Sequence, residues 1–329
     1  DVESRGLGDV YKRQGLRRAD AFMILLSDKD RIIGEKTAVA LGLFDGVHKG
    51  HRLVIGQAVS RRPKLKAAVF SFKTDTVTSK CADGAPPEML LSESDKLKIF
   101  ESLGADYAYS PDFSLLKNMT PEEFVRDILA GRLNCGFAVC GEDFRFGAKA
   151  MGNADTLKEY GEKYGFEVCV IKQMKCDGAA ISSTKIRNLI KSGDISKANS
   201  LLGSRYGYTL PVEHGFQRGR TWGFPTVNQT IPEGLVLPRF GVYCSKILID
   251  GIWHNAITNI GVKPTVEKNS PPLAETFIID YDGDLYGKTL TTELYEFVRP
   301  ERTFATFDEL KAEIAENIEQ VKKYFSGQR

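Results

Sequence analysis

The sequence predicts two successive domains: an α/β domain built on a parallel sheet, then an antiparallel β-barrel with a C-terminal helix. Three observations support this prediction. The chain has 329 residues, more than one hydrophobic core usually serves. Short apolar runs alternate with amphipathic stretches from Thr37 to about Ile190, which is a βα repeat. Beyond residues 190–200, apolar and polar residues alternate between tight-turn dipeptides, as in antiparallel strands.

The first domain is expected to contain strands at 37–44, 66–72, 106–110, 136–142 and 166–172, with helices near 51–61, 92–103, 121–133 and 154–164. Thr120 and Glu123 form a capping box, with Pro121 at the first helical position. Near-continuous apolar strands joined by helices imply a parallel sheet covered on both faces. Ligands are then expected at the carboxyl ends of the strands.

The second domain follows a helix that Asp194 is expected to cap. Asp250-Gly251 and Asp282-Gly283 are dipeptides that permit the positive φ angles of hairpin turns. A final helix follows Thr306, with Glu309 three positions on. Its apolar stripe consists of Leu310, Ile314, Ile318, Val321 and Phe325.

Residues 1–22 carry charges throughout and have neither an apolar signal-peptide core nor a helical or strand period. Periodic sequence begins at about Met23, so residues 1–22 are interpreted as a tail or an artefact upstream of the true start. The expected domains are therefore 23–192 and 198–329.

Composition narrows the class of protein. Hydrophobic residues make up 42% and charged residues 27%, as in ordinary globular proteins. The net charge of +2 gives no support for a nucleic-acid surface, and no run approaches the about 18 apolar residues of a membrane-spanning helix. The six cysteines include no CxxC pair, which favours reduced thiols over a zinc site. We expect a soluble cytoplasmic protein that binds neither nucleic acid nor membrane.

The first predicted strand runs directly into the string GLFDGVHKGH, residues 42–51. Its glycines allow the backbone to approach a ligand closely, and the helix that follows presents free N–H groups to phosphate. His48 and His51 can point to one side and donate hydrogen bonds to the same phosphate. HxxH alone is equally typical of structural histidines, but the full string after a buried strand favours a phosphate site.

Two later segments belong beside this string. ISSTKIR (181–187) places three hydroxyls, a lysine and an arginine at a helix start, which suits a triphosphate. Alone it could be an N-cap with a solvated basic face. GEDFRFG (141–147) offers aromatic faces and an acid to a planar ligand at the end of a strand. Its alternative is an ordinary loop with two core phenylalanines.

These three motifs, in this order and spacing, resemble the FMN adenylyltransferase domain of bacterial bifunctional riboflavin kinase/FAD synthetases, an HxGH nucleotidyltransferase with a Rossmann-like fold. The resemblance implies that the FMN phosphate attacks the α-phosphate of ATP directly and that pyrophosphate leaves. It implies catalytic roles for His48 and His51, which stabilise charge on the phosphates, and for Arg187, which holds the ATP tail. The implied ATP-binding residues are Gly42, Phe44, Asp45, Gly46, Ser182, Ser183 and Thr184, and the implied flavin-binding residues are Asp143, Phe144 and Phe146.

One segment departs from this family. After the second predicted strand the family is expected to read like TFxPHP, whereas this chain has SFKTDT at residues 71–76. The histidine and both prolines are missing. The flavin contacts of this loop are therefore expected to differ, while the ATP site is unaffected.

In the antiparallel half, GRTWGFPTVN (219–228) combines glycines with Arg220 for phosphate. Thr226 and Asn228 offer hard oxygen ligands, which suit Mg²⁺, and in a strand they point to the same face. Alone, the string could be a glycine-rich barrel turn capped by Pro225.

The segments RFGVY (239–243), TNIGVKPT (258–265), AETFIIDYDGDLYGK (274–288) and FVRPERTF (297–304) follow in the order seen in riboflavin kinases. This second resemblance implies that Glu275 is the general base and that Thr226 and Asn228 contact metal and phosphate. It also implies ATP contacts from Gly219, Arg220, Gly223 and Pro225. The family usually has histidine where this chain has Phe277, a change expected to alter a hydrogen bond to the base or the packing beneath it.

The resemblances together imply a bifunctional enzyme with riboflavin, FMN and ATP as ligands, Mg²⁺ accompanying ATP, and flavins as substrate and product. Three alternatives stay open. Only one domain could be active, or the first domain could act on nicotinamide or pantetheine nucleotides. The chain could also be a flavin-binding regulator without turnover.

Overall fold

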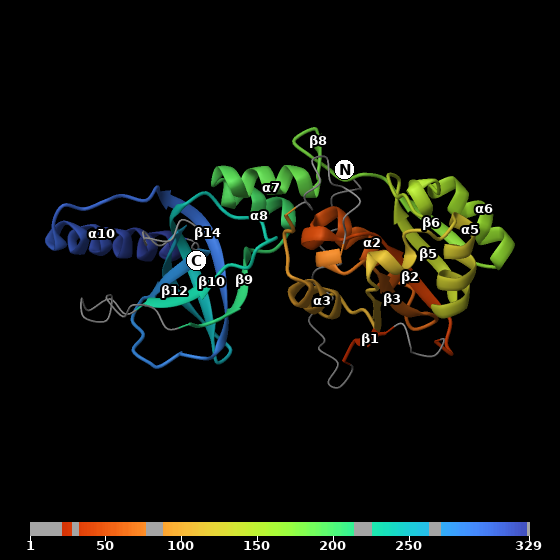
Figure 1. The fold of residues 1–329 in the computed structure, drawn as a ribbon, viewed down its shortest axis with the longest axis horizontal. Coiled ribbons are helices and arrows are strands. Elements are labelled where there is room, and N and C mark those ends of the chain that lie inside the picture. The colour runs from red at the N-terminus through yellow and green to blue at the C-terminus, as the bar shows by residue number, and fades with distance from the viewer. Residues whose placement is uncertain (1–21, 28–32, 77–87, 214–225, 263–270, 328–329) are drawn as a thin grey trace.

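The computed structural model describes residues 22–27, 33–76, 88–213, 226–262 and 271–327. Two lobes are joined by helices α7 (Ser183–Ser192) and α8 (Ile195–Leu202) (Figure 1). The first lobe holds a parallel sheet, and the second holds an antiparallel sheet with a long final helix. The predicted fold class is confirmed, while the predicted tail lies outside the described residues except for Phe22.

The parallel sheet has the strand order β1-β4-β3-β2-β5-β6. All five predicted strands are present, and β1 at the sheet edge is an additional strand that pairs with β4. The strands are β1 (Ile24–Leu26), β2 (Thr37–Leu41), β3 (Lys66–Phe70), β4 (Tyr107–Tyr109), β5 (Cys135–Gly141) and β6 (Glu167–Ile171). Because β2 lies between β3 and β5, the sheet order reverses there, and such a point leaves a crevice at the carboxyl ends of the strands.

Alternate residues of β2 enter two different cores. Val39 and Leu41 pack with Phe124 and Leu157, whereas Ala38 and Ala40 pack with helix residues on the opposite face. This explains why the strands read as continuous apolar runs. The helices of this lobe are α2 (Lys49–Val59), α3 (Glu93–Ser102), α4 (Phe113–Leu116), α5 (Pro121–Glu123) continuing as a π-type helix to Arg132, and α6 (Ala154–Tyr164).

The predicted capping box is confirmed. Thr120 Oγ1 accepts a hydrogen bond from Glu123 N–H at 3.2 Å, and Thr120 N–H donates to Glu123 Oε2 at 2.8 Å. The predicted cap at Asp194 is also present, since its Oδ1 accepts from Lys197 N–H at 3.2 Å. A short hairpin of β7 (Lys175–Cys176) and β8 (Ala179–Ala180) precedes α7 and was not predicted.

The second sheet is antiparallel, with the strand order β10-β13-β12-β11-β14-β9. The strands are β9 (Tyr206–Pro211), β10 (Thr226–Thr230), β11 (Gly241–Ile249), β12 (Ile252–Val262), β13 (Pro272–Ile278) and β14 (Thr289–Arg299). Asp250 and Gly251, at φ 48° and 85°, make the predicted hairpin between β11 and β12.

The second predicted hairpin is wrong. β13 pairs with β10 and β12, not with β14, so the segment 279–288 containing Asp282-Gly283 crosses between strands that are not neighbours. The dipeptide reports only local backbone preference. The pairing is decided by the long-range order of the strands, which a two-residue signal does not contain.

Gln229 links the two edges of this sheet into a barrel. Its buried Nε2 donates to the carbonyls of Leu210 and Leu290, each at 2.8 Å, and its Oε1 accepts from Thr292 Oγ1 at 2.7 Å. At the rim, Glu213 N–H donates to Asn228 O at 2.8 Å. The edge strands β9 and β10 are thereby brought together.

Helix α10 (Phe307–Ser326) covers the outer face of β11 and β12. Thr306 caps it as predicted, accepting from Glu309 N–H at 3.2 Å. Of the predicted stripe, Val321 is fully buried and Ile318 and Phe325 pack beside it.

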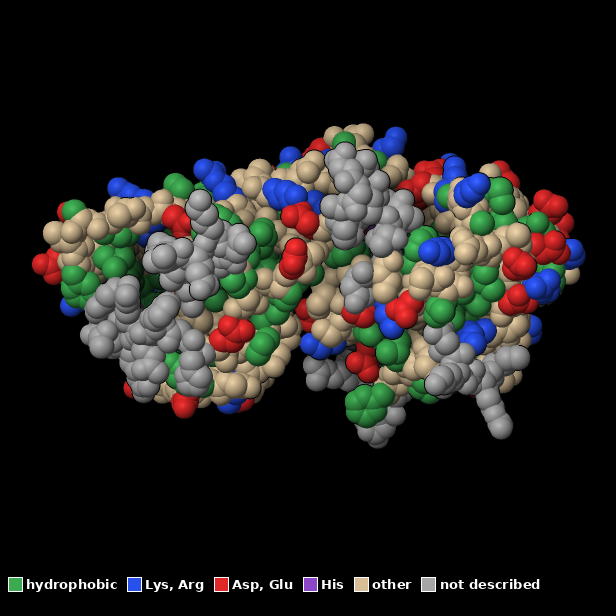
Figure 2. All heavy atoms as spheres, viewed as in Figure 1, with side chains coloured by type: hydrophobic (Ala, Val, Ile, Leu, Met, Phe, Trp, Pro, Cys, Tyr) green, Lys and Arg blue, Asp and Glu red, His purple; other side chains and the backbone are tan. Residues whose placement is uncertain are grey.

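The two lobes share one core. Apolar residues of α7 and α8, such as Ile186 and Leu201, cluster with Tyr206 and Leu294 of the barrel. In addition, Met89 N–H donates to Gly234 O at 2.7 Å, and Val236 N–H donates back to Met89 O at 2.9 Å. On the face drawn in Figure 2, acidic and basic side chains are interspersed over both lobes.

Candidate active sites

The turn after β2 places two histidines at the start of α2. Phe44 and Gly46 have φ of 50° and 79°, a conformation that glycine adopts freely, and they reverse the chain at the end of the strand. His48 is then the N-cap of α2, since its Nδ1 accepts from His51 N–H at 3.3 Å. The remaining N–H groups of the first helical turn follow the carboxyl end of β2, where a ligand crevice is expected in a parallel sheet.

The two imidazole rings are stacked, with centroids 3.5 Å apart and planes at 19°. The edge-to-face contact of Phe44 with His51, at 5.3 Å, holds the second ring. Burial lowers the pKa of His48 to about 4, so this imidazole is neutral at pH 7. Because Nδ1 acts as an acceptor, the proton must be on Nε2. His48 therefore offers one N–H donor to a ligand.

Asp45 and Arg187 form a buried ion pair beside this turn, with Asp45 Oδ2 and Arg187 Nη2 2.6 Å apart. Arg187 Nε also donates to Glu88 O at 2.6 Å, and Asp45 Oδ1 accepts from Leu90 N–H at 2.8 Å. Burial raises the pKa of the Asp45 carboxyl, against the opposing effects of Arg187 and Leu90. Asp45 is only 2% exposed, so its side chain orients Arg187.

The ISSTKIR hydroxyls lie at the start of α7, next to the histidine turn. Ser182 caps the helix by accepting from Lys185 N–H at 3.2 Å, and Ser183 Oγ donates to Asp45 O at 2.9 Å. Thr184 Oγ1 lies 3.5 Å from Arg187 Nη1. The structure therefore brings together two predicted motifs that are far apart in sequence, each at a helix N-terminus.

The three predicted flavin-binding residues follow β5 but differ in exposure. Asp143 is exposed and Phe144 is half-buried, with its ring stacked on Phe146 at 5.6 Å and 15°. Phe146 is 6% exposed and packs against Phe124 at 5.5 Å. Phe146 thus belongs to the core and supports Phe144, which is the ring closer to solvent.

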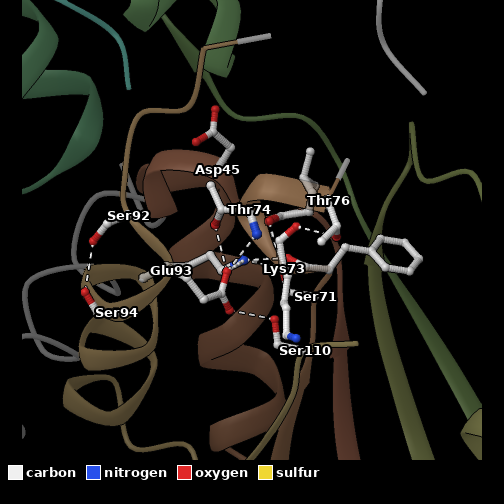
Figure 3. A network of polar contacts seen from close by, with 12 residues as sticks. Asp45, Ser71, Lys73, Thr74, Thr76, Ser92, Glu93, Ser94 and Ser110 are labelled. Carbon is white, nitrogen blue, oxygen red and sulfur yellow. Dashed lines mark hydrogen bonds and ion pairs between the residues drawn. The ribbon is translucent and has the colours of Figure 1, made fainter. Parts of the chain in front are cut away.

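The loop SFKTDT is anchored by a carboxylate from α3. Figure 3 shows Glu93 between Thr74 and Ser110. Glu93 Oε2 accepts from the backbone N–H of Thr74 at 2.8 Å and from its hydroxyl at 2.7 Å, while Oε1 accepts from Ser110 Oγ at 2.6 Å. The loop is therefore fixed to the neighbouring strand ends.

A buried lysine completes this network. Lys96 is 1% exposed, and its Nζ lies 2.9 Å from Glu93 Oε2 while donating to Phe72 O at 2.6 Å and Ser71 Oγ at 3.2 Å. Ser71 Oγ donates in turn to Leu43 O, at the histidine turn, at 2.8 Å. Burial alone would raise the pKa of Glu93, but Lys96 and the hydroxyl donors outweigh it and lower that pKa. Lys96 was not predicted as a site residue.

In the barrel, three polar residues lie side by side on adjacent strands. Glu275 of β13 is opposite Asn228 of β10 on one side and Asn259 of β12 on the other. Their chain neighbours, such as Thr258 and Thr276, are buried inside the barrel, so by alternation the three residues face outward. We call them the Asn-Glu-Asn row.

Both flanking asparagines of the row carry an unusual feature. Among the described residues, the buried Oδ1 atoms of Asn228 and Asn259 have no hydrogen-bond partner. A buried amide oxygen left without a partner costs about 1–3 kcal/mol, so each of these oxygens is open to a hydrogen bond from a ligand or water, or to a cation. Asn228 was predicted as a metal contact, but Asn259 was missed although its motif TNIGVKPT had been noted.

Of the other residues predicted for the kinase site, Thr226 is described by the structure and the ATP contacts are not. Thr226 lies on the same strand face as Asn228, opposite Phe277 of β13. Phe277 packs against the apolar cluster beneath α10, so the residue that departs from the family pattern fills a packing position. Gly219, Arg220, Gly223 and Pro225 lie outside the described residues.

Comparison with known proteins assigns the two lobes. Residues 31–185 match the family model described as FAD synthetase, and residues 202–325 match the one described as riboflavin kinase. A bifunctional riboflavin kinase/FMN adenylyltransferase of Bacillus subtilis (strain 168) is 33% identical over 300 residues, covering 89% of this chain and 94% of that protein. The chain belongs to the bifunctional riboflavin kinase/FMN adenylyltransferase family.

Other members of this family are similarly related. The Escherichia coli (strain K12) protein of the same name is 33% identical over 297 residues, covering 88% of this chain and 93% of that protein.

A solved structure titled macrolide-efflux protein, from Streptococcus pneumoniae, matches with a TM-score of 0.81 and 27% identity over 92% of this chain and 99% of that one. None of the helices described for this chain is long and apolar enough to cross a membrane.

Proposed function

We infer that this chain converts riboflavin to FMN and FMN to FAD, using ATP in both reactions and one domain for each. The observation that carries this inference is the presence of two separate polar sites on two sheets. The stacked pair His48 and His51 lies at a helix N-terminus of the first sheet, and the Asn-Glu-Asn row lies on the second. A chain that catalysed a single reaction would need only one of these two sites.

In the adenylyltransferase domain, an oxygen of the FMN phosphate attacks the α-phosphorus of ATP. A new P–O bond forms, the bond to the β-phosphate oxygen breaks, and pyrophosphate leaves. Neutral His48 donates from Nε2 to the phosphate oxygens, and His51 beside it does the same. Arg187, oriented by Asp45, adds a fixed positive charge.

The hydroxyls at the start of α7 hold the ATP phosphates in this proposal, together with the backbone of the histidine turn. Both elements present a helix N-terminus, which favours anions. The turn contributes Gly42, Phe44 and Gly46 through main-chain atoms, since the Phe44 ring is buried. Phe144 and Asp143 then face the flavin, with Phe146 supporting Phe144 from the core.

In the kinase domain, Glu275 accepts the proton of the ribityl 5′-hydroxyl as that oxygen attacks the γ-phosphorus of ATP. The new O–P bond forms, the bond between the γ-phosphorus and the bridging oxygen breaks, and ADP leaves. A carboxylate suffices as the base, because phosphoryl transfer depends chiefly on positioning and charge neutralisation.

Asn228 and Thr226 are proposed to hold Mg²⁺ with the ATP phosphates. The donor set fits this ion, since both residues offer neutral oxygens and the buried Oδ1 of Asn228 has no partner in the described part of the chain. When bound, the ion neutralises phosphate charge during transfer. The two residues are proposed to bring the γ-phosphate to the side of Glu275 on which β10 lies.

The domains are proposed to span 23–192 and 198–329, and the separate family matches over 31–185 and 202–325 support a boundary in the region of α7 and α8. We place both reactions in the cytoplasm, where ATP is available. Incubation of the purified chain with riboflavin, ATP and Mg²⁺, and in parallel with FMN in place of riboflavin, tests the inference. FAD from both samples is expected, and the absence of any product would refute it.

Two substitutions separate the sites. Glu275→Gln is expected to abolish FMN formation and to leave the conversion of supplied FMN to FAD unchanged. His51→Asn is expected to do the reverse. Loss of both reactions in either folded variant would contradict the assignment of one reaction to each domain.

A further inference from the structure

Asn259 occupies a defined position beside the proposed base. It lies on β12 directly opposite Glu275 of β13, and Asn228 lies on the other side of Glu275. Thr258, its neighbour in the chain, is fully buried and hydrogen-bonds Ser245 and Thr276 inside the barrel. Asn259 therefore faces outward with Glu275, and the separation between directly opposed side chains is about 5 Å.

The Asn259 amide has one end bound and one end available. Its Nδ2 donates to Glu301 Oε1 at 3.3 Å, which turns the amide so that the oxygen points away from Glu301. That oxygen is buried and, within the described residues, accepts no hydrogen bond. An amide oxygen in this state can be satisfied by an O–H or N–H donor or by a hard cation.

The exposed side chain of Glu301 lies over β12. A Cβ atom at Gly261 would overlap Glu301 Oε1, so this position allows the close approach because it is glycine. The backbone around Glu301 is clamped to α10, since Glu313 binds Arg299 Nε at 2.7 Å and Arg302 Nη1 at 3.1 Å. The C-terminal helix thereby anchors the segment that carries the acceptor of Asn259.

We propose that Asn259 is a further substrate-binding residue of the kinase site, whose Oδ1 accepts a hydrogen bond from a hydroxyl of the ribityl chain. Glu301 is a positioning residue that fixes the amide. The proposal rests on the kinase role of Glu275. It is also supported by the order of the strands, in which β13 with Glu275 lies between β10 and β12. Thr226 and Asn228, the proposed metal contacts, are on β10, so the phosphate reaches Glu275 from that side. The alcohol that Glu275 deprotonates then enters from the side of β12.

The first test substitutes the amide and measures both reactions of the whole chain. Asn259→Leu keeps the size of the side chain but removes its acceptor. We expect KM for riboflavin to rise about tenfold, as for one lost buried hydrogen bond, with KM for MgATP within about twofold. The conversion of supplied FMN to FAD should be unchanged. An unaltered KM for riboflavin would overturn the proposal.

Lumiflavin, which has the isoalloxazine ring but no ribityl hydroxyls, provides a matched probe. Its inhibition constant is expected to be the same for the wild-type chain and for Asn259→Leu, which also shows that the barrel is folded. A shift in the Mg²⁺ concentration needed for half-maximal activity, with KM for riboflavin unchanged, would make Asn259 a metal contact and overturn the proposal.

Glu301 supplies a second pair of variants if Asn259→Leu does not fold. Glu301→Gln retains an acceptor for Asn259 Nδ2 and is expected to keep KM for riboflavin near the wild-type value. Glu301→Ala releases the amide and is expected to raise it several-fold. Equal values for the two variants would refute the positioning role. Failure of the wild-type chain to form FMN would instead refute the proposed function, so that measurement comes first.

Discussion

The Asp45 carboxylate lies 2.6 Å from the Arg187 guanidinium, although 142 positions separate the two residues in the sequence. The same carboxylate accepts from Leu90 N–H, and Arg187 donates to Glu88 O. One buried charge thereby joins the histidine turn, the start of α7 and the segment before α3. The arginine proposed for charge stabilisation is held by a residue that the resemblance had assigned to ATP binding.

Breaking this pair is expected to weaken the first domain. Asp45→Asn leaves Arg187 with no compensating charge and should destabilise this domain by about 3 kcal/mol, as in other buried pairs that lose one partner. FAD formation should fall while FMN formation persists. Chemical denaturation of Asp45→Asn, Arg187→Met and the double variant measures the coupling, and strictly additive effects would show that the pair contributes nothing.

The neutral state of His48 predicts a dependence of stability on pH. Its pKa is about 4 in the folded chain and 6.5 in the unfolded chain. Between these two pH values, His48 is protonated in the unfolded chain and neutral in the folded chain. Stability is then greatest above pH 6.5 and decreases by up to about 3 kcal/mol as the pH falls to 4. His48→Asn keeps a capping acceptor but does not titrate. Urea denaturation between pH 4 and 7 should show a smaller pH effect in this variant.

Lys96 is expected to fix the loop SFKTDT and, through Ser71, the histidine turn. Lys96→Met leaves the partly buried Glu93 carboxylate without its cation, which should cost about 1–3 kcal/mol and raise KM for FMN. The double variant with Glu93→Gln removes both charges and should recover part of the lost stability. Hydrogen exchange at Ser71 to Thr76 checks the loop directly, with kinase activity as the internal control.

Gln229 is predicted to be a stability residue of the barrel. Gln229→Leu removes the Nε2 donor from two carbonyls and the Oε1 acceptor from the Thr292 hydroxyl in a fully buried site. The expected loss is about 2–4 kcal/mol, because each unsatisfied group retains its desolvation cost. Calorimetry of the full chain should show a lower transition temperature for the kinase domain. Gln229→Glu keeps the shape but replaces the Nε2 donor with an acceptor, so it should also be destabilised, and an unchanged transition temperature in Gln229→Leu would contradict the prediction.

Much of the fold could be predicted from local patterns. Continuous apolar strands reflected a sheet covered on both faces, and the box at Thr120 and Glu123 gave a helix start. The Asp282-Gly283 hairpin was wrong because local turn preference does not determine which strands pair. The histidine turn and ISSTKIR were recognised as motifs, but only their contact in space revealed that Asp45 forms an ion pair with Arg187 and orients it.

Sequence patterns did not identify Lys96 and Asn259 as site residues, and the reason is physical. Lys96 stands in the polar helix segment SESDKLK, which is typical of a solvated face, yet tertiary packing buries it. Asn259 is one polar residue in an alternating strand, and its position opposite Glu275 depends on the register of β12 and β13. Both signals arise from contacts between distant segments, which periodicity does not contain.

The hydrogen bonds between Met89 and the barrel loop at Gly234 and Val236 have a practical consequence for dividing the protein. A fragment ending after α7 would lose these bonds and would expose the apolar side chains of Ile186 and Ile190, which belong to the core shared with the barrel. Separately produced halves should therefore aggregate or recombine when mixed. The two domains are held together by a shared hydrophobic core as well as by the polypeptide chain.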